Sequence, residues 1–275
     1  MRASNDNVLH GPRLIFYFFE PGLVKVVIVY LTKKINSMAN DLKNKVAYIT
    51  GGSKGIGFGI AKVLLSQGVK VAITSRSLAA AKDAAALLTN DKSKILPLES
   101  QVSSLESETK AVQACIDHFG KLDILIANAG VGYFSPIDEL SPQQWHETIE
   151  TNLTGVFNSV KAAIPALKTS KGYIITIASL AGINFFENGA AYNASKFGLV
   201  GFTQAIMLDL RKYGVKVSTI MPGSVATYFN NHVPSDADAW KIQPEDIGEV
   251  VKDLLIMNPR TLPSKIEIRP SMPVK

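Results

Sequence analysis

The stretch Val46-Ala-Tyr-Ile-Thr50-Gly51-Gly-Ser-Lys-Gly55-Ile-Gly57 decides the fold. A short apolar run ends at a cluster of glycines, which leads into Ile60–Leu65, a segment with helical spacing of its apolar residues. The order strand, tight turn, helix opens a β-α-β unit. Glycines suit this turn because the absence of a side chain lets backbone N–H groups approach an anion at the helix N-terminus. An ordinary glycine-rich turn is the weaker alternative.

Downstream, apolar runs alternate with helical patterns, which indicates a parallel sheet covered on both faces. No linker or change in composition divides this part of the chain. We therefore predict an α/β protein with a single doubly wound Rossmann-type domain over residues 38–275, a mostly parallel sheet and helices on both faces. The expected strands are 46–50, 70–74, 94–98, 122–127, 173–178, 215–221 and 265–269, and the later helices are 79–88, 103–119, 142–167, 190–212 and 244–257.

Several local signals refine this prediction. Pro97 predicts an interrupted ladder in the third strand. Ser103-x-x-Glu106 predicts a capping box, and Ser141-Pro-Gln-Gln144 predicts another helix start. Residues 224–240 lack periodicity, so we expect a mobile loop there.

Composition excludes some classes of protein. The chain has 275 residues, of which 19% are charged and 47% hydrophobic, so it is globular rather than disordered. A net charge of +6 is too weak to indicate a nucleic-acid partner. The single cysteine, Cys115, permits no intrachain disulfide and fits a reducing compartment, so we expect a cytoplasmic protein. The histidines show no metal-ligand spacing, so no metal site is predicted; they are His10, His118, His146 and His232.

The first 37 residues differ from the rest of the chain. Two apolar runs lie within residues 14–31, but Glu20, Pro21-Gly22 and Lys25 interrupt them. A membrane-spanning helix needs about 20 mostly apolar residues. We expect residues 1–37 to be a dispensable leader, or sequence upstream of a translation start at Met38. Membrane contact through residues 14–31 is the less favoured alternative.

Tyr192-Asn-Ala-Ser-Lys196 places a tyrosine and a lysine on one face of a helix. A phenol with a pKa near 10 is a poor acid–base catalyst at neutral pH, and a nearby ammonium group favours the phenolate. Such a pair also occurs by chance on many helices. Ser179 at the end of a strand, together with the dinucleotide loop, makes the catalytic interpretation the stronger one.

Five motifs, in order over residues 44–270, resemble those of the classical short-chain dehydrogenase/reductase family. They are Thr50-Gly51-x-x-x-Gly55-x-Gly57, Asn128-Ala-Gly130, Asn152, Ser179 with Tyr192-x-x-x-Lys196, and Pro222-Gly223-x-Val225-x-Thr227. The resemblance implies an NADPH-dependent carbonyl reductase similar to 3-oxoacyl-(acyl-carrier-protein) reductases.

The resemblance also implies residue roles. Tyr192 gives its proton to the developing alkoxide, Ser179 hydrogen-bonds that oxygen, and Lys196 lowers the pKa of Tyr192 and holds the nicotinamide ribose. Asn152 positions a water that re-supplies the proton. The implied cofactor-binding residues are Gly51, Ser53, Lys54, Gly55, Ile56, Gly57, Ser75, Arg76, Gln101, Val102, Asn128, Ala129, Gly130, Tyr192, Lys196, Pro222, Gly223, Val225 and Thr227.

The coenzyme expected is NADP(H). An NAD site usually has a carboxylate about 20 residues beyond the glycines, which binds the ribose 2′-OH. The second strand ends instead at Ser75-Arg76, and a guanidinium can pair with a 2′-phosphate. Lys54 can bring a second positive charge.

The sequence departs from the family at two places. Gln101-Val102 stands where Asp-Val is frequent, and Ile268–Lys275 lacks the apolar, glycine-containing tail that builds one tetramer interface in relatives. The expected assembly is therefore a homodimer or a homotetramer.

The substrate stays open. We expect a small-molecule or acyl-thioester carbonyl compound; another alcohol, sugar or pterin-type substrate is the alternative. A binding protein that senses the nucleotide without turnover is the rival from another class. Residues 180–191 and 224–240 are expected to form the walls of the substrate pocket, and their aromatic residues offer apolar surface: Phe185, Phe186, Tyr228 and Phe229. The equal alternative is that these residues belong to loops that only close the core.

Overall fold

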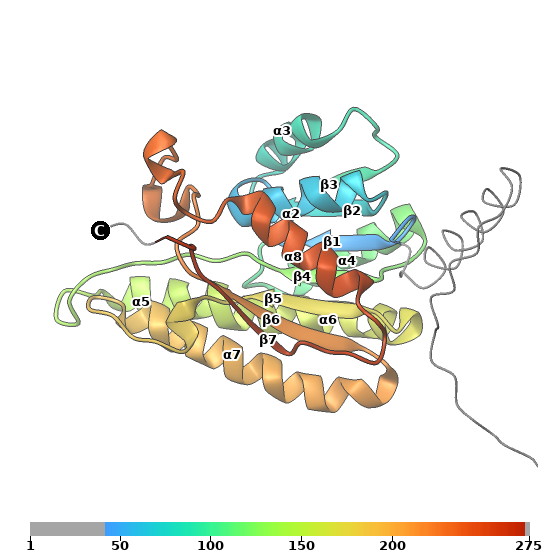
Figure 1. The fold of residues 1–275 in the computed structure, drawn as a ribbon. Coiled ribbons are helices and arrows are strands. Elements are labelled where there is room, and N and C mark those ends of the chain that lie inside the picture. Colours follow the sequence, from blue (N-terminus) through green and yellow to red (C-terminus); the bar gives the residue numbers. More distant parts are fainter. Residues whose placement is uncertain (1–41, 273–275) are drawn as a thin grey trace, which may run out of the picture. The chain divides into compact units, whose positions relative to one another are not determined.

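Seven parallel strands, taken in the order β3-β2-β1-β4-β5-β6-β7, form the sheet within the residues that the computed structural model describes, 42–272 (Figure 1). The predictions for residues 1–37, including membrane contact through 14–31, lie outside this range. The strands are β1 (Val46–Ile49), β2 (Lys70–Ser75), β3 (Ile95–Glu99), β4 (Ile124–Ala127), β5 (Tyr173–Ile177), β6 (Lys216–Pro222) and β7 (Lys265–Ile268).

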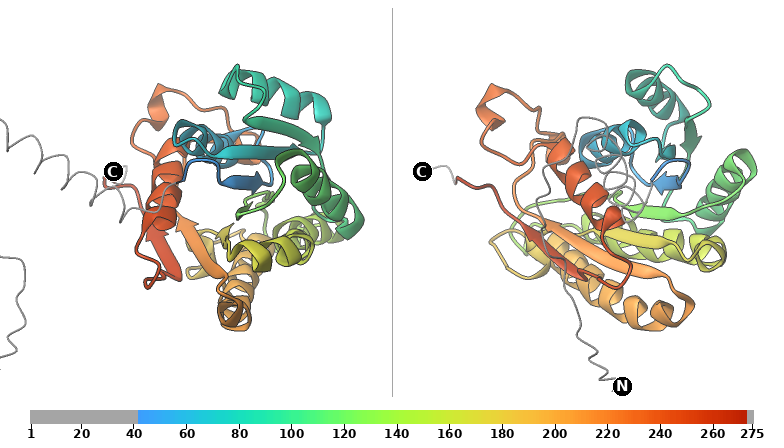
Figure 2. Two further views of the ribbon diagram at one scale, coloured as in Figure 1. Left: turned by 90° about the vertical axis from the view of Figure 1, so that its right-hand side faces the viewer. Right: turned by 45° about the vertical axis from the view of Figure 1, so that its right-hand side comes forward.

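The helices cover both faces of this sheet (Figures 1 and 2). Strand residues alternate between the two cores: Ile49 packs among the residues of α2, α3 and α8, whereas Tyr48 packs with those of α4, α6 and α7. Since both faces are buried, the strands read as continuous apolar runs. The helices are α2 (Gly55–Ser66), α3 (Leu78–Leu88), α4 (Leu105–Phe119), α5 (Pro142–Ile149), α6 (Gly155–Ser170), α7 (Ala190–Leu210) and α8 (Pro244–Ile256).

The order of the strands reverses beside β1. β2 pairs with one edge of β1, and β4 pairs with the other, both in parallel register. The chain after β1 therefore runs in one direction across the sheet, and the chain after β4 runs in the other. In such sheets a crevice opens at the carboxyl ends of the strands on either side of the reversal, and ligands bind there. The predicted single doubly wound α/β domain is confirmed.

Three local predictions were wrong. Ser104, not Ser103, caps α4, and its hydroxyl accepts a hydrogen bond from the Ser107 N–H. Pro97 does not interrupt the ladder, because β3 is an edge strand and Pro97 stays in register with Ile73. Residues 142–167 do not form one regular helix: a π-helical turn at Glu150–Thr154 separates α5 from α6.

The segment 224–240 contains two short 3-10 turns, Phe229–Asn231 and Asp236–Asp238. The helix start predicted at Ser141 is confirmed, and Ser141 and Gln144 form a capping box there. Within residues 42–272, no helix combines the length and the apolar character needed to cross a membrane.

Helices α2 and α8 cross at small residues. A Cβ built on Gly59 would lie 2.4 Å from the Pro244 carbonyl carbon and 2.5 Å from its oxygen. These are backbone atoms, so they cannot move aside as a flexible side chain would.

We predict that Gly59→Ala destabilises the protein by about 1–3 kcal/mol, because the added methyl forces the two helices apart. Gly201→Ala is the matched control: Gly201 is exposed in α7, and a Cβ there would meet nothing within 4 Å. In an exposed helix, alanine is more stable than glycine by about 0.5–1 kcal/mol. Chemical unfolding of both variants provides the measurement, and equal stabilities would refute the proposed packing constraint.

Candidate active site and coenzyme cleft

The glycine loop links β1 to α2 in a conformation that glycine makes possible. Gly51 has φ +64° and Gly55 φ +58°, both in the left-handed region. Gly57 has ordinary backbone angles but no room for a side chain, since a Cβ would lie 2.5 Å from the Gly51 carbonyl oxygen. The three glycines of the motif are therefore required by the backbone path and by close packing.

Thr50 and Asn128 join the ends of β1 and β4. The Thr50 hydroxyl accepts hydrogen bonds from the N–H groups of Asn128 and Ala129, both at 3.0 Å. In return, the Asn128 side-chain amide donates to the carbonyl oxygens of Thr50 at 2.9 Å and Gly51 at 3.1 Å. These bonds fix the glycine loop on the strand at the reversal of the sheet.

This loop fits the diphosphate of a dinucleotide. The first N–H groups of a helix have no partner inside the helix, and the helix dipole favours an anion beside them. The first turn of α2, Gly55–Phe58, carries no acidic side chain that would compete with such an anion. Gly51, Ser53, Gly55 and Ile56 are partly accessible there, and Lys54 is exposed.

Arg76 follows β2 as expected from the sequence. Its side chain is 72% exposed, and its guanidinium lies 3.9 Å from Glu147 of α5. An ion pair this exposed and this long is weak, so Glu147 holds Arg76 loosely. Ser75 lies beside it and accepts a hydrogen bond from the Ser77 N–H at 3.4 Å.

The remaining predicted coenzyme contacts occupy the same end of the sheet. Val102 is buried, and its carbonyl oxygen accepts a hydrogen bond from Asn158 at 2.9 Å, whereas Gln101 is exposed and donates to Ser103. The turn that begins at Pro222 and Gly223 continues to Thr227, whose Cβ lies 3.4 Å from the position of a Cβ on Gly55. Val225 pairs with Ile242 in an isolated bridge and anchors this turn.

Tyr192, Ser179 and Lys196 converge beyond β5. Ser179 caps the 3-10 turn Leu180–Gly182, and its side chain is hydrogen-bonded to the phenol of Tyr192. Lys196, one helical turn after Tyr192 on α7, donates to the carbonyl oxygen of Ile177 at 3.0 Å. Its ammonium nitrogen lies 5.6 Å from the centre of the Tyr192 ring. A Cβ built on Gly130 would lie 3.8 Å from the same nitrogen, so the segment after β4 adjoins this group.

Burial governs the protonation of this pair. It raises the pKa of Tyr192 to about 12, against the lowering effect of the hydrogen bond with Ser179. It also lowers the pKa of Lys196 to about 8. The lowering of the tyrosine pKa expected from Lys196 is not found here, because burial of the phenol raises its pKa and the opposing contribution comes from Ser179. Tyr192 is protonated at neutral pH and can donate its proton.

Asn152 is fully buried in the π-helical turn. Its side-chain oxygen accepts from the Val131 N–H at 2.8 Å, and its NH₂ group donates to the Val131 carbonyl oxygen at 2.8 Å and to Ser195 at 3.0 Å. Ser195 donates to the carbonyl oxygen of Tyr192 at 2.8 Å. Asn152 thus connects the segment after β4 to the start of α7.

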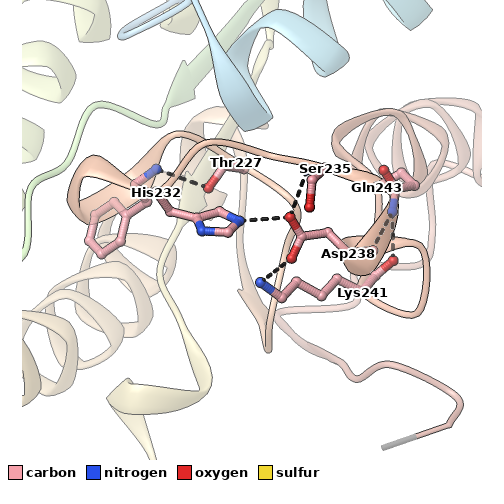
Figure 3. Close-up of polar contacts among 7 residues, drawn as sticks. Thr227, His232, Ser235, Asp238, Lys241 and Gln243 are labelled. Carbon is pink, nitrogen blue, oxygen red and sulfur yellow. Dashed lines mark hydrogen bonds and ion pairs between the residues drawn. The ribbon is translucent and has the colours of Figure 1, made fainter. Parts of the chain in front are cut away.

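The segment 224–240 is held by a buried carboxylate, Asp238 (Figure 3). It accepts hydrogen bonds from the Ser235 N–H at 3.0 Å, contacts His232 at 2.7 Å and forms an ion pair with Lys241 at 2.6 Å. The pKa of Asp238 lies well below its usual range, because Lys241, the Ser235 N–H and His232 all favour the charged form.

Sequence reasoning missed several of these residues. Thr50 and Ser195 stood inside the motifs but carried no distinctive signal of a structural role. Asn193, which donates to the carbonyl oxygens of Ala181 and Asn184 and so holds the chain after Ser179, was equally hidden. Asp238 lies in an aperiodic segment. Within residues 42–272 the structure contains no group of three or more His, Cys, Asp or Glu side chains placed to bind a metal ion.

Fold and glycine loop together define a dinucleotide-binding protein, and comparison with known proteins specifies its family. Residues 45–238 match the short chain dehydrogenase family. A trans-4-hydroxycyclohexanecarboxylate dehydrogenase of Sinomonas cyclohexanicum is 37% identical over 199 residues, which cover 70% of this chain and 77% of that protein. The chain belongs to the short-chain dehydrogenase/reductase family of oxidoreductases.

Solved structures with a similar fold include the following two enzymes. An alcohol dehydrogenase from Thermococcus sibiricus complexed with 5-hydroxy-NADP has a TM-score of 0.78 and 29% identity, covering 84% of this chain and 99% of its own. A 3-ketoacyl-(acyl-carrier-protein) reductase from Brucella melitensis complexed with NADH has a TM-score of 0.76 and 26% identity, covering 84% and 98%. Members of this family bind a nicotinamide coenzyme and act on carbonyl or alcohol groups.

We predict that Asp238→Asn loosens segment 224–240 at neutral pH, because the amide loses the ion pair with Lys241. Hydrogen exchange measured by mass spectrometry should show faster exchange in this segment. Since the folded pKa is lowered, the carboxylate stabilises the segment above the pKa of an unfolded aspartate, about 4, and the effect is lost as pH falls toward the folded value. Asp236→Asn is the control, because Asp236 is exposed beside the cluster. Equal exchange in both variants would contradict the role of Asp238.

Proposed function

We propose that this protein is an NADP(H)-dependent reductase that converts a substrate carbonyl to an alcohol. The observation that carries the proposal is the convergence of Ser179, Tyr192 and Lys196 next to a glycine loop that fits a dinucleotide. When bound, the nicotinamide coenzyme supplies the hydride that reduces the carbonyl carbon.

The residues then have distinct tasks. Tyr192, protonated at neutral pH, gives its proton to the carbonyl oxygen as negative charge develops there. Ser179 can donate a hydrogen bond to the same oxygen. Lys196 has a pKa of about 8, so it is largely charged at neutral pH, where it stabilises the tyrosinate left behind. Asn152 holds Val131 and Ser195 in place through hydrogen bonds. In the proposed mechanism it also positions a water that re-supplies the proton to Tyr192.

The proposed substrate is a carbonyl compound, for which the comparisons suggest two candidate classes. A 3-oxoacyl thioester is a candidate because of the likeness to the Brucella melitensis reductase, and a ring alcohol is a candidate because of the likeness to the Sinomonas cyclohexanicum dehydrogenase. Another alcohol, sugar or pterin-type substrate is the alternative within the family.

We also propose a homodimer or homotetramer in the cytoplasm. Supporting the assembly, α6 and α7 expose large apolar side chains, and patches of this kind mark contacts between proteins. They include Phe157 and Phe197, 46% and 39% exposed, and Leu208, 54% exposed.

We predict that Tyr192→Phe lowers carbonyl reduction by a factor of about 10² to 10⁴, the usual contribution of general acid catalysis, and leaves coenzyme binding intact. The turnover number and the coenzyme dissociation constant of the purified variant provide the test. Tyr213→Phe, at the opposite end of the sheet, is the control. Unchanged turnover in Tyr192→Phe would remove this residue from the mechanism. A wild-type protein that binds NADPH but reduces no carbonyl would favour the nucleotide-sensing alternative.

The coenzyme preference rests on Arg76, which is exposed at the end of β2 and only loosely paired. We predict that Arg76→Ala weakens NADPH binding by about 1.5–3 kcal/mol, the contribution of a charged hydrogen bond, and leaves NADH nearly unchanged. The ratio of kcat/KM for the two coenzymes, measured in wild type and variant, tests this prediction. Arg260→Ala, an exposed arginine outside the site, serves as the control. A wild-type preference for NADH would overturn the assignment.

A further inference from the structure

Two aromatic rings contact the ring of Tyr192, and a third packs against one of them. The centre of the Phe134 ring lies 5.5 Å from that of Tyr192 in an edge-to-face arrangement, and Phe229 lies 5.5 Å away on a tilted plane. Phe186 joins through Phe134, at 5.7 Å. We call Phe134, Phe186 and Phe229 the aromatic cluster. Its members come from the connections that follow β4, β5 and β6.

Two glycines make room for this cluster. A Cβ on Gly132 would lie 2.6 Å from the Phe229 ring, and a Cβ on Gly189 would lie 2.6 Å from the Phe186 ring. A side chain at either position would displace a ring. The rings of Phe229 and Phe186 therefore pack directly against backbone that carries no side chain. Loops that only close a core would not need such close packing.

The cluster keeps an accessible surface. Phe134 is 38% exposed and Phe186 is 47% exposed. Phe186 also lines an open groove of about 570 Å³ between residues 135–137 and 185–193, a size that suits a small molecule. The Ser135 N–H donates to the Asn188 carbonyl oxygen at 3.0 Å and joins the two sides of the groove.

The charge of the groove is equally informative. Its lining includes Ile137 and Phe185, which are 73% and 83% exposed. Glu187 is the only charged residue among the residues that line it. Within the groove, an anionic group of the substrate would therefore meet a carboxylate and no cation, whereas an apolar body would cover exposed rings and gain the free energy of their burial.

From these observations we infer that the substrate is an uncharged ketone with a compact hydrocarbon body that packs on the aromatic cluster. This inference rests on the proposed reductase function and narrows its substrate class. It disfavours ketones that carry a carboxylate, and substrates whose phosphates must bind within the groove.

The test compares three ketones with the wild-type protein and NADPH: cyclohexanone, 4-oxocyclohexanecarboxylate and acetoacetyl-coenzyme A. We expect kcat/KM for cyclohexanone to exceed that for the ring carboxylate by about tenfold or more, the range that pocket contacts give. Phe134→Ala should lower kcat/KM for cyclohexanone by about tenfold, mainly through KM, and Phe134→Leu should restore most of it. Tyr213→Ala is the control, because Tyr213 is similarly exposed, at 43%, and lies outside the cluster.

The charge is tested separately. Glu187→Lys should raise kcat/KM for 4-oxocyclohexanecarboxylate about tenfold and change that for cyclohexanone by less than about twofold. If the wild type prefers the carboxylate or the thioester, the inference fails and the reductase function stands. If no ketone is reduced although NADPH binds, the proposed function fails and the inference with it.

Discussion

The hydrogen bonds between Thr50 and the chain at Asn128 hold together the point at which the sheet changes direction. β1 and β4 are neighbours there, yet Thr50 and Asn128 lie 78 positions apart along the chain. The glycine loop follows β1, and Asn128–Gly130 follows β4. The position of each segment depends on its hydrogen bonds with the other. Because Thr50 accepts from two backbone N–H groups and Asn128 donates to two carbonyl oxygens, both segments are fixed by the same small set of bonds.

Further contacts connect the segment after β4 to Asn152 and to the start of α7. Gly130 adjoins Lys196, and Val131 is held by Asn152. Asn152 in turn reaches Ser195, which contacts the backbone of Tyr192. The contacts pass from the glycine loop to the backbone of Tyr192, and the side chains of Asn152 and Ser195 on this route are hydrogen-bonded. Buried polar networks of this kind specify one geometry, since any displacement would leave a donor or an acceptor without a partner.

The sequence predicted the features that depend on local chemistry. Apolar runs predicted the strands, because burial on both faces leaves no room for polar residues, and Ser141 predicted a helix start through its capping box. Features that depend on distant partners were not predictable. Pro97 is tolerated only because β3 lies at the edge, which the strand order decides. The fully buried Glu108 of α4, whose carboxylate accepts from Tyr48 and Ser100, and the Asp238 cluster likewise depend on residues that no local pattern brings together.

The site residues also differ in how far local sequence determines their properties. Tyr192 and Lys196 form a spacing motif on one helix, so their proximity was predictable, but the balance of their pKa values was not. That balance depends on how much water the surrounding segments exclude. A hydrogen bond with Ser179 opposes the effect of burial on the phenol without reversing it. The protonated tyrosine is thus a product of the closed environment, and it matches a residue that donates a proton to a carbonyl group.

Segment 224–240 brings the two halves of the site into one element. Thr227 lies against Gly55 of the glycine loop, and Phe229, two residues later, lies against Tyr192. The Phe229 N–H donates to the Thr227 hydroxyl at 3.3 Å, so the two positions are also joined directly. The base of the segment is held by the bridge between Val225 and Ile242, and its far end by Asp238. A shift at Thr227 must therefore move Phe229, because the chain between them is too short to absorb it. Thr227, a proposed coenzyme contact, is consequently linked mechanically to the aromatic cluster beside the tyrosine.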